Sequence, residues 1–203
     1  MNIKRIFYLI TFLGLCASCK ETNEQRLDKR NKLSKEKNYD KAIEVYNTVI
    51  KNNSKLQLAY YNRGITYLGL KKYNKALWDF NKVMALQTHG DFIIIDNQDS
   101  PFANEEARTQ VPYNDALYQR AQVKYFMDSL KSSFMDFQIL VDNNYEEKSN
   151  CVLWQGALFI RGGKTAKACE YFEKAKQLAV TANDRDEASN MLKTHCKELN
   201  NNR

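Results

Sequence analysis

Residues 59–64 (AYYNRG) and 76–80 (ALWDF) decide the fold of this 203-residue chain. The same pattern returns as ALYQRA at residues 116–121 and as SFMDF at residues 133–137. Both pairs of segments lie 57 residues apart, so the two halves of the pattern keep their spacing. Self-similarity at a fixed spacing is the signature of a repeat architecture, and it takes precedence over any local assignment of secondary structure.

The pattern extends in both directions by about one further unit. Stepping 34 residues back and 35 residues forward gives a small residue followed four positions later by an aromatic residue. The four pairs are Ala42 and Tyr46, Ala76 and Phe80, Ser133 and Phe137, and Ala168 and Phe172. Apolar residues at positions 42, 43, 46, 49 and 50, and again at 76, 77, 80, 83 and 84, follow helical spacing. The sequence therefore predicts a series of amphipathic helices.

These positions resemble the tetratricopeptide repeat (TPR), a helix–turn–helix unit of about 34 residues. The resemblance implies an all-α fold over residues 23–199: a TPR-type α-solenoid of about four repeats plus a C-terminal capping helix. Small residues at repeat positions 8 and 20 let the two helices approach, and the aromatic residue at position 24 fills the space between them. Position 8 is occupied by Arg30, Gly64, Ala121 and Gly156. Arg30 departs from the pattern, as expected of an atypical terminal unit.

The capping helix is predicted to begin at Asn183, a capping residue followed by acids in the first turn. Its apolar stripe comprises Ala188, Met191, Leu192, His195 or Cys196, and Leu199, and residues 200–203 are expected to form a disordered tail. A helix of this kind covers the last apolar face of a repeat array. Gly162 and Gly163 are predicted to form the turn inside repeat four.

Repeats two and three are separated by an insertion at about residues 87–112. It holds both prolines, Pro101 and Pro112, and an apolar run at residues 92–95 (FIII) that aspartates bracket. Two interpretations stay open. The apolar run packs against its neighbours and only fills space, or the insertion is a functional loop, as long ordered loops usually are.

The first 18 residues predict a lipoprotein-type signal peptide. Lys4 and Arg5 precede an apolar run at residues 6–15, which is about half of the ~20 residues that a membrane-spanning helix needs. Residues 16–19 (CASC) resemble the lipobox of bacterial lipoproteins, which implies a palmitate-bearing Cys19 as mature N-terminus and a tether at residues 19–22. Cys16 departs from the usual Leu, and an ordinary cleaved signal is the alternative. We expect export to the cell envelope and anchoring in the outer membrane.

Composition and motifs predict neither an enzyme nor a nucleic-acid-binding protein. The 31 Lys and Arg exceed the 24 Asp and Glu, but cations alternate with acids, as in residues 35–37 (KEK) and 184–187 (DRDE). The two histidines, His89 and His195, lie far apart in sequence, and the chain contains no glycine-rich phosphate loop. No metal-ligand spacing is found. We therefore expect no cofactor and no metal.

Besides Cys19, three cysteines follow the signal: Cys151, Cys169 and Cys196. In the repeat register, Cys169 lies on the side of repeat four that faces the closing helix, and Cys196 lies near the end of that helix. These two are candidates for a disulfide, which an exported compartment permits. Burial as separate thiols is the alternative.

The TPR resemblance places partner contacts on the first helix of each repeat, which lines the concave face. The corresponding residues are Leu27, Asn31, Leu58, Tyr61, Asn62, Ile65, Leu68, Asp115, Tyr118, Gln119 and Gln122. This aromatic, amide and aliphatic lining suits an extended peptide or a helix. Some family members clamp a terminal carboxylate with paired cations and asparagines. Leu27, Asp115 and Gln119 occupy the cationic positions here, which argues against such a clamp.

The sequence thus predicts a non-enzymatic, membrane-anchored scaffold that binds a protein or peptide partner. Two alternatives remain. One is an accessory lipoprotein that holds a glycan or another small ligand against Trp154 or the insertion, and the other is an enzyme whose site lies in residues 87–112.

Overall fold

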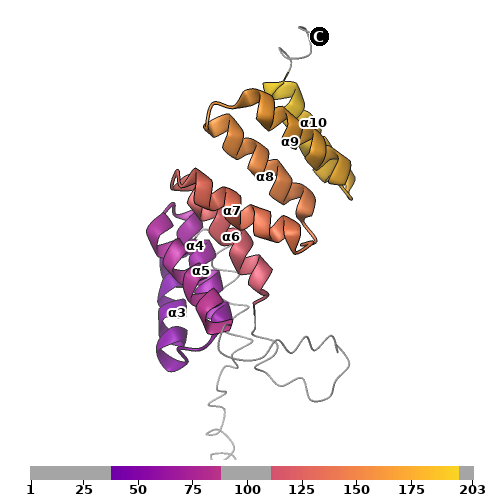
Figure 1. Ribbon diagram of the computed structural model, residues 1–203. Coiled ribbons are helices and arrows are strands. Elements are labelled where there is room, and N and C mark those ends of the chain that lie inside the picture. The colour runs from indigo at the N-terminus through magenta and orange to yellow at the C-terminus, as the bar shows by residue number, and fades with distance from the viewer. Residues whose placement is uncertain (1–37, 88–110, 197–203) are drawn as a thin grey trace, which may run out of the picture.

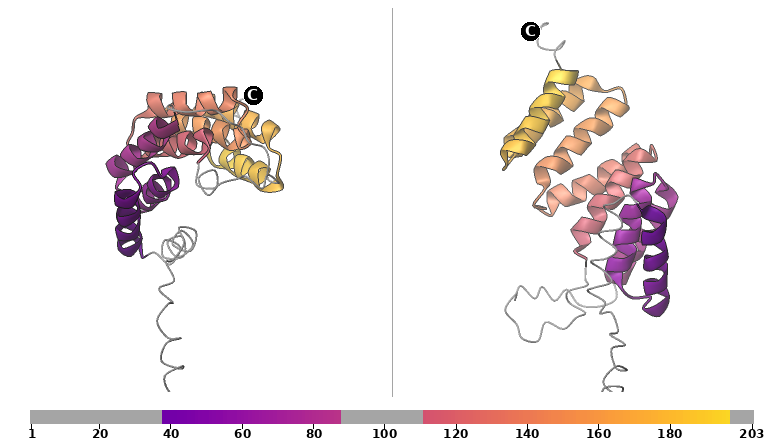
Figure 2. Two further views of the ribbon diagram at one scale, coloured as in Figure 1. Left: turned by 90° about the horizontal axis from the view of Figure 1, so that it is seen from below. Right: turned by 180° about the vertical axis from the view of Figure 1, so that it is seen from behind.

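The structure is a computed structural model that describes residues 38–87 and 111–196. These two ranges contain eight helices and no strand. The helices are α3 (Tyr39–Asn52), α4 (Gln57–Gly69), α5 (Tyr73–Gln87), α6 (Tyr113–Phe126), α7 (Leu130–Asp142), α8 (Lys148–Arg161), α9 (Thr165–Leu178) and α10 (Ala182–His195). Each helix packs mainly against its neighbours along the chain, and the stack bends into an arc (Figures 1 and 2). The expectation of an all-α TPR solenoid is confirmed.

The helix pairs follow the predicted repeats. Repeat two is α4 and α5, repeat three is α6 and α7, and repeat four is α8 and α9, with α10 as the closing helix. Helix α3 takes the place of the second helix of repeat one. The residues that the repeat pattern assigns to the first helix, including Arg30, lie outside the described residues. Among the described residues, no helix is both long and apolar enough to cross a membrane.

The predicted small and aromatic positions form the centre of every helix pair. Ala42, Ala76, Ser133 and Ala168 have no exposed surface, and neither have Tyr46, Phe80, Phe137 and Phe172. Position 8 is also buried. A Cβ atom on Gly64 would lie 2.9 Å from Cε1 of Phe80, and one on Gly156 would meet Cε1 of Phe172 more closely still. The repeat register thus identifies the close approach of the two helices in each unit.

The three turns inside repeats two, three and four share one backbone conformation. Lys71, Asp128 and Gly163 have φ angles of 57°, 61° and 70°. In each turn the following residue donates its N–H to a carbonyl five residues back: Lys72 to Tyr67, Ser129 to Lys124, and Lys164 to Phe159. This left-handed cap ends the first helix and reverses the chain. The predicted turn at Gly162 and Gly163 is confirmed, and Lys71 and Asp128 show that the same turn forms without glycine.

The closing helix begins earlier than the sequence analysis predicted. Its N-cap is Thr181, not Asn183, because the Thr181 side chain accepts a hydrogen bond of 3.1 Å from the backbone N–H of Asp184. Thr181 has extended backbone angles, as an N-cap requires, whereas Asn183 already lies in the first turn.

A disulfide joins Cys169 on α9 to Cys196 at the end of α10, with 5.9 Å between the Cα atoms. The interpretation as two separate buried thiols is therefore wrong in this structure. Cys151 on α8 is a free, buried thiol, and its burial raises its pKa to about 12. A thiol that stays protonated is a poor nucleophile, so Cys151 is a core residue.

The two ends of the insertion are held together. Helix α5 includes Gln87, and the side-chain amide of Gln87 donates to the carbonyl of Val111. The side-chain oxygen of Gln57 accepts from the N–H of Val111 at 3.2 Å. Gln87 and Val111 therefore belong to the solenoid rather than to the insertion as predicted, and α5 packs against α6 as in an uninterrupted array. Residues 88–110 lie outside the described residues.

Candidate functional site

The first helices of the repeats line the inner side of the arc. Helix α4 contacts α6 directly, and α8 contacts α10, so the first helices crowd together on this side. Nine predicted partner-binding residues lie on α4 and α6 and are half-buried: Leu58, Tyr61, Asn62, Ile65, Leu68, Asp115, Tyr118, Gln119 and Gln122. Leu27 and Asn31 lie outside the described residues, so they stay predictions.

Tyr61 links repeat two to repeat three. Burial raises the pKa of the Tyr61 phenol to about 12, and the negative charge of Asp115 raises it further. A hydrogen bond with Gln119 acts in the opposite direction. Tyr61 on α4 and the predicted residues Asp115 and Gln119 on α6 thus come together on the inner surface.

Tyr118 links repeat three to repeat four through Trp154. The indole N–H of Trp154 donates to the Tyr118 hydroxyl at 3.2 Å, and the indole stacks on Phe137 with ring centroids 6.0 Å apart. Burial raises the pKa of Tyr118 to about 12. The N–H of Trp154 is engaged by Tyr118 and one face of its ring by Phe137. These contacts argue against Trp154 as a platform for a small ligand.

Tyr145 completes this network and was missed by the sequence analysis. Its hydroxyl donates to Oδ1 of Asp115 at 2.8 Å, and its ring lies 5.9 Å from that of Tyr118. Burial and this hydrogen bond raise the pKa of Tyr145. Tyr145 lies in the turn before α8, where the repeat pattern places no defined residue, so no signal in the sequence identified it. This hydrogen bond engages Asp115, which carries the one carboxylate among the nine described residues of the predicted lining.

The inner surface therefore offers hydroxyl and amide groups, while the carboxylate of Asp115 is engaged by Tyr145. The side-chain amide of Asn62 forms no hydrogen bond within the described part of the chain. Amides of this kind pair with the backbone of an extended segment, and the apolar stems of neighbouring residues contact its side chains. Among residues 38–87 and 111–196, no group of three or more His, Cys, Asp or Glu is placed to hold a metal ion.

Two ion pairs with buried carboxylates, one in repeat two and one in repeat three, hold this surface in place. Arg63 on α4 binds both carboxylate oxygens of Asp79 on α5, at 2.6 and 2.9 Å. Arg120 on α6 binds Asp136 on α7 in the same way, at 2.8 and 2.9 Å. Burial raises the pKa of Asp79, and the hydrogen bond from Arg63 counteracts it. The sequence analysis aligned both arginines and both aspartates at 57-residue spacing but did not pair them.

Cations also gather on one edge of the solenoid, contrary to the dispersed distribution that the sequence analysis expected. The turns inside repeats two, three and four lie at the same end of their helix pairs and carry six exposed lysines. We call this surface the basic turn edge; it comprises Lys71, Lys72, Lys75, Lys131, Lys164 and Lys167. Folding brings these residues together from three separate stretches of sequence, which a linear pattern of alternating charges does not reveal.

Comparison with known proteins identifies the repeats. Residues 58–88 and residues 151–179 each match the family described as Tetratricopeptide repeat. The chain therefore contains TPR repeats, and the matched stretches coincide with α4–α5 and α8–α9.

Dynein axonemal assembly factor 4 from Mus musculus is 43% identical over 61 residues. The match covers 30% of this chain and 14% of the mouse protein, so the chain corresponds to a small part of that relative.

Solved TPR structures share the fold. MamA (residue 41 to the end) from Desulfovibrio magneticus RS-1 has a TM-score of 0.60 at 20% identity, over 78% of this chain and 76% of that chain. YrrB, described as a TPR protein with an unusual peptide-binding site, has a TM-score of 0.55 at 18% identity, over 88% of this chain and 81% of that chain. At these identities the likeness shows the fold alone.

Proposed function

We propose that this chain is a non-enzymatic protein–protein interaction scaffold of the bacterial cell envelope. In this proposal it is anchored to the outer membrane through a lipid on Cys19, and it binds a peptide or protein segment on its concave face. The fold and the repeats are those of a TPR solenoid of the kind that binds proteins. The anchor, the envelope location and the absence of catalysis are the proposal.

The observation that carries the binding role is the inner surface of α4 and α6. It presents Asn62, Gln119 and Gln122 amides between half-buried tyrosines, and its Asp115 carboxylate is engaged by Tyr145. Such a surface hydrogen-bonds to peptide backbone without demanding a charged end. YrrB, with the same fold, is described as having a peptide-binding site.

The disulfide between Cys169 and Cys196 supports export. Disulfides persist in oxidising compartments such as the bacterial periplasm and the cell surface, and they are rare in the cytosol. This agrees with the signal-like segment at residues 1–18 and with Cys19 in its lipobox-like context.

Fractionation of cells tests the anchor. With Cys19→Ala, we expect an unprocessed precursor or release of the protein from the membrane fraction, because acyl chains no longer hold it there. Cys16→Ala is the matched control, and it should be processed and retained normally. Unchanged mass and unchanged membrane retention of the Cys19→Ala protein would refute the lipoprotein assignment.

Crosslinking and pull-down from membranes tests the binding role. Asn62→Arg and Gln122→Arg place a bulky cation on the inner surface, and we expect each to reduce recovery of crosslinked partners by about tenfold or more, as loss of a central contact does. Lys174→Glu, on the exposed face of α9, serves as the control. Equal recovery with all three variants would mean that the partner does not bind the concave face.

A further inference from the structure

The basic turn edge is continuous from repeat two to repeat four. The rings of Tyr73 and Phe126 stack with centroids 5.6 Å apart, which joins the first turn to the second. Arg161 contacts Asp128 at 2.8 Å, which joins the second turn to the third. In Figure 1 the turns α4–α5 and α6–α7 lie side by side on the left of the molecule, and the turn α8–α9 follows above them.

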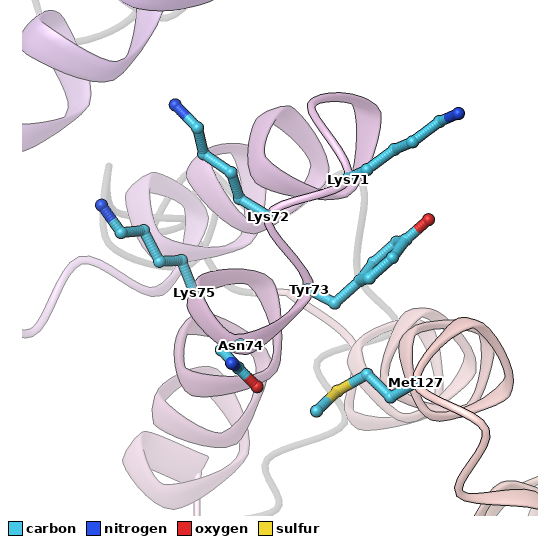
Figure 3. Close-up of a pocket in the computed structure, with 6 residues that line it drawn as sticks. All are labelled: Lys71, Lys72, Tyr73, Asn74, Lys75 and Met127. Carbon is cyan, nitrogen blue, oxygen red and sulfur yellow. The ribbon is translucent and has the colours of Figure 1, made fainter.

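Two pockets lie along this edge, each between consecutive turns. The first, of about 460 Å³, is lined by Lys71, Lys72, Tyr73, Asn74, Lys75 and Met127. Figure 3 shows Asn74 and Met127 facing each other across it, while the Lys72 and Lys75 side chains extend together to one side. The first pocket thus combines the apolar Met127 and the aromatic Tyr73 with three lysines.

The second pocket, of about 410 Å³, is more apolar. It is lined by Leu130, Lys131, Phe134, Met135, Leu158, Phe159, Gly162 and Lys164. Met135, one of its lining residues, is 56% exposed, so apolar surface of this pocket is open to a partner. Lysines again stand at the rim, because Lys131 and Lys164 flank the opening from α7 and from the turn before α9.

The charge on this edge is one-sided. Its only acid among the described turn residues is Asp128, which is paired with Arg161. The opposite edge, formed by the turns between repeats, is of mixed charge: its acids, such as Glu146 and Glu147, lie among cations such as Lys51, Lys55 and Lys148. A surface that concentrates one sign of charge selects partners of the opposite sign and steers their approach.

We propose that the basic turn edge is a second interaction surface, which binds an acidic segment of a partner protein whose apolar side chains enter the two pockets. The lysines supply the charge complementarity, and the pockets are of a size that takes apolar side chains. A nucleic acid or an anionic membrane offers charge but no side chains for apolar pockets. The surface is separate from the concave face, so it does not depend on the function proposed above.

Fluorescence anisotropy with a synthetic probe tests this proposal. The probe is a fluorescein-labelled peptide in which Glu and Asp alternate with Leu and Phe, and the control peptide carries Gln and Asn in place of the acids. The full-length protein should bind the acidic probe, more weakly as salt is raised. Failure to bind the acidic probe, or equal binding of both peptides, would overturn the proposal.

Charge-reversal variants locate the site. The triple variant Lys72→Glu, Lys131→Glu and Lys164→Glu should weaken binding of the acidic probe by about tenfold or more. These lysines form no ion pair within the described part of the chain, and acids at helix N-termini are favourable, so the fold should survive. The control, Lys51→Glu, Lys174→Glu and Lys176→Glu, makes the same change of charge elsewhere. Equal losses in the two triple variants would show a non-specific effect of net charge.

A second pair of variants tests the pockets. Met135→Gln removes an apolar contact from the second pocket and should weaken the probe several-fold, whereas Ile139→Gln, an exposed change on the same helix outside the pocket, should not. Anionic phosphatidylglycerol vesicles and single-stranded DNA serve as competing ligands. If either binds with the same dependence on the three edge lysines while the peptide does not, the edge is a lipid or nucleic-acid site and the proposal is wrong.

Discussion

Repeats two and three hold their helices together differently from repeat four. In the first two, a partly buried arginine on the first helix binds a buried aspartate on the second, as Arg63 binds Asp79. At the arginine position repeat four has Gln155, whose amide donates to Gln138 of the previous repeat at 3.1 Å. Repeat four compensates with the closest helix approach, at Gly156, and with a disulfide to the closing helix.

Repeats two and three are thus held by noncovalent contacts alone, whereas repeat four is also linked to the closing helix by a disulfide. The ion-paired repeats carry the predicted inner surface, so its geometry is independent of the redox state of the compartment. The last repeat has only one neighbouring repeat, because repeat arrays are stabilised by nearest-neighbour contacts. The disulfide joins this last repeat to the closing helix.

Arg63→Ala should produce the largest loss of stability. Asp79 has no exposed surface, so removal of Arg63 leaves a buried carboxylate without its partner. Breaking a buried pair in this way costs about 3–5 kcal/mol of unfolding free energy. Urea denaturation followed by circular dichroism measures it.

The exposed pair of Arg161 and Asp128 provides the matched control. Arg161→Ala should change stability little, because solvent screens this pair. The double variant Arg63→Met and Asp79→Leu should recover most of the loss caused by Arg63→Ala. Similar losses for Arg63→Ala and Arg161→Ala would contradict the distinction between buried and exposed pairs.

Loss of the disulfide should rank second and act on the other end of the molecule. Cys169 and Cys196 are 27 residues apart in sequence, and the loop-entropy relation gives about 3–4 kcal/mol for a loop of this size. Thermal melting of the oxidised protein, with and without a reductant, measures the effect. The variant Cys169→Ser and Cys196→Ser should be insensitive to the reductant; a response would assign the effect to another thiol.

Overpacking at position 8 should have a smaller effect. Gly64→Leu pushes a side chain against Phe80 and should cost about 1–3 kcal/mol. Between alanine variants, Gly156→Ala should be more damaging than Gly64→Ala, because its Cβ atom would approach Phe172 more closely than the Cβ atom at Gly64 would approach Phe80. An unaltered melting temperature for Gly64→Leu would mean that the repeat register is wrong.

The smallest effect is the pH dependence that the inner tyrosines impart. Burial raises the pKa of Tyr61 from 10.0 to about 12, so the folded chain holds this proton more tightly than the unfolded chain. The stabilisation is complete below pH 10 and is lost as pH rises towards 12. Tyr61→Phe should make the fall of unfolding free energy over this range shallower, and Tyr118→Phe should do the same. Leu153→Phe, at the same position of repeat four, should leave the slope unchanged.

The fold could be predicted from the sequence because it depends on residues that recur. Ala76 and Phe80 and their counterparts define the helix pairs, and local spacing alone reveals them. The site was predicted less well. Tyr145 reaches the inner surface from a turn without a repeat position, and the six lysines of the basic turn edge meet only after folding. The pairing of Arg63 with Asp79 lay within reach, since both residues recur in repeat three.

Site-specific photo-crosslinking in living cells tests the binding role of the inner surface most directly. A photoreactive amino acid is placed at Asn62 or Gln122 on the inner surface, and at Lys174 or Lys176 on the exposed face of α9 as controls. The inner positions should give a discrete crosslinked product of one partner, and the control positions should give none. Products of equal yield from both sets, or products from the α9 positions alone, would contradict the assignment of the concave face as the binding surface.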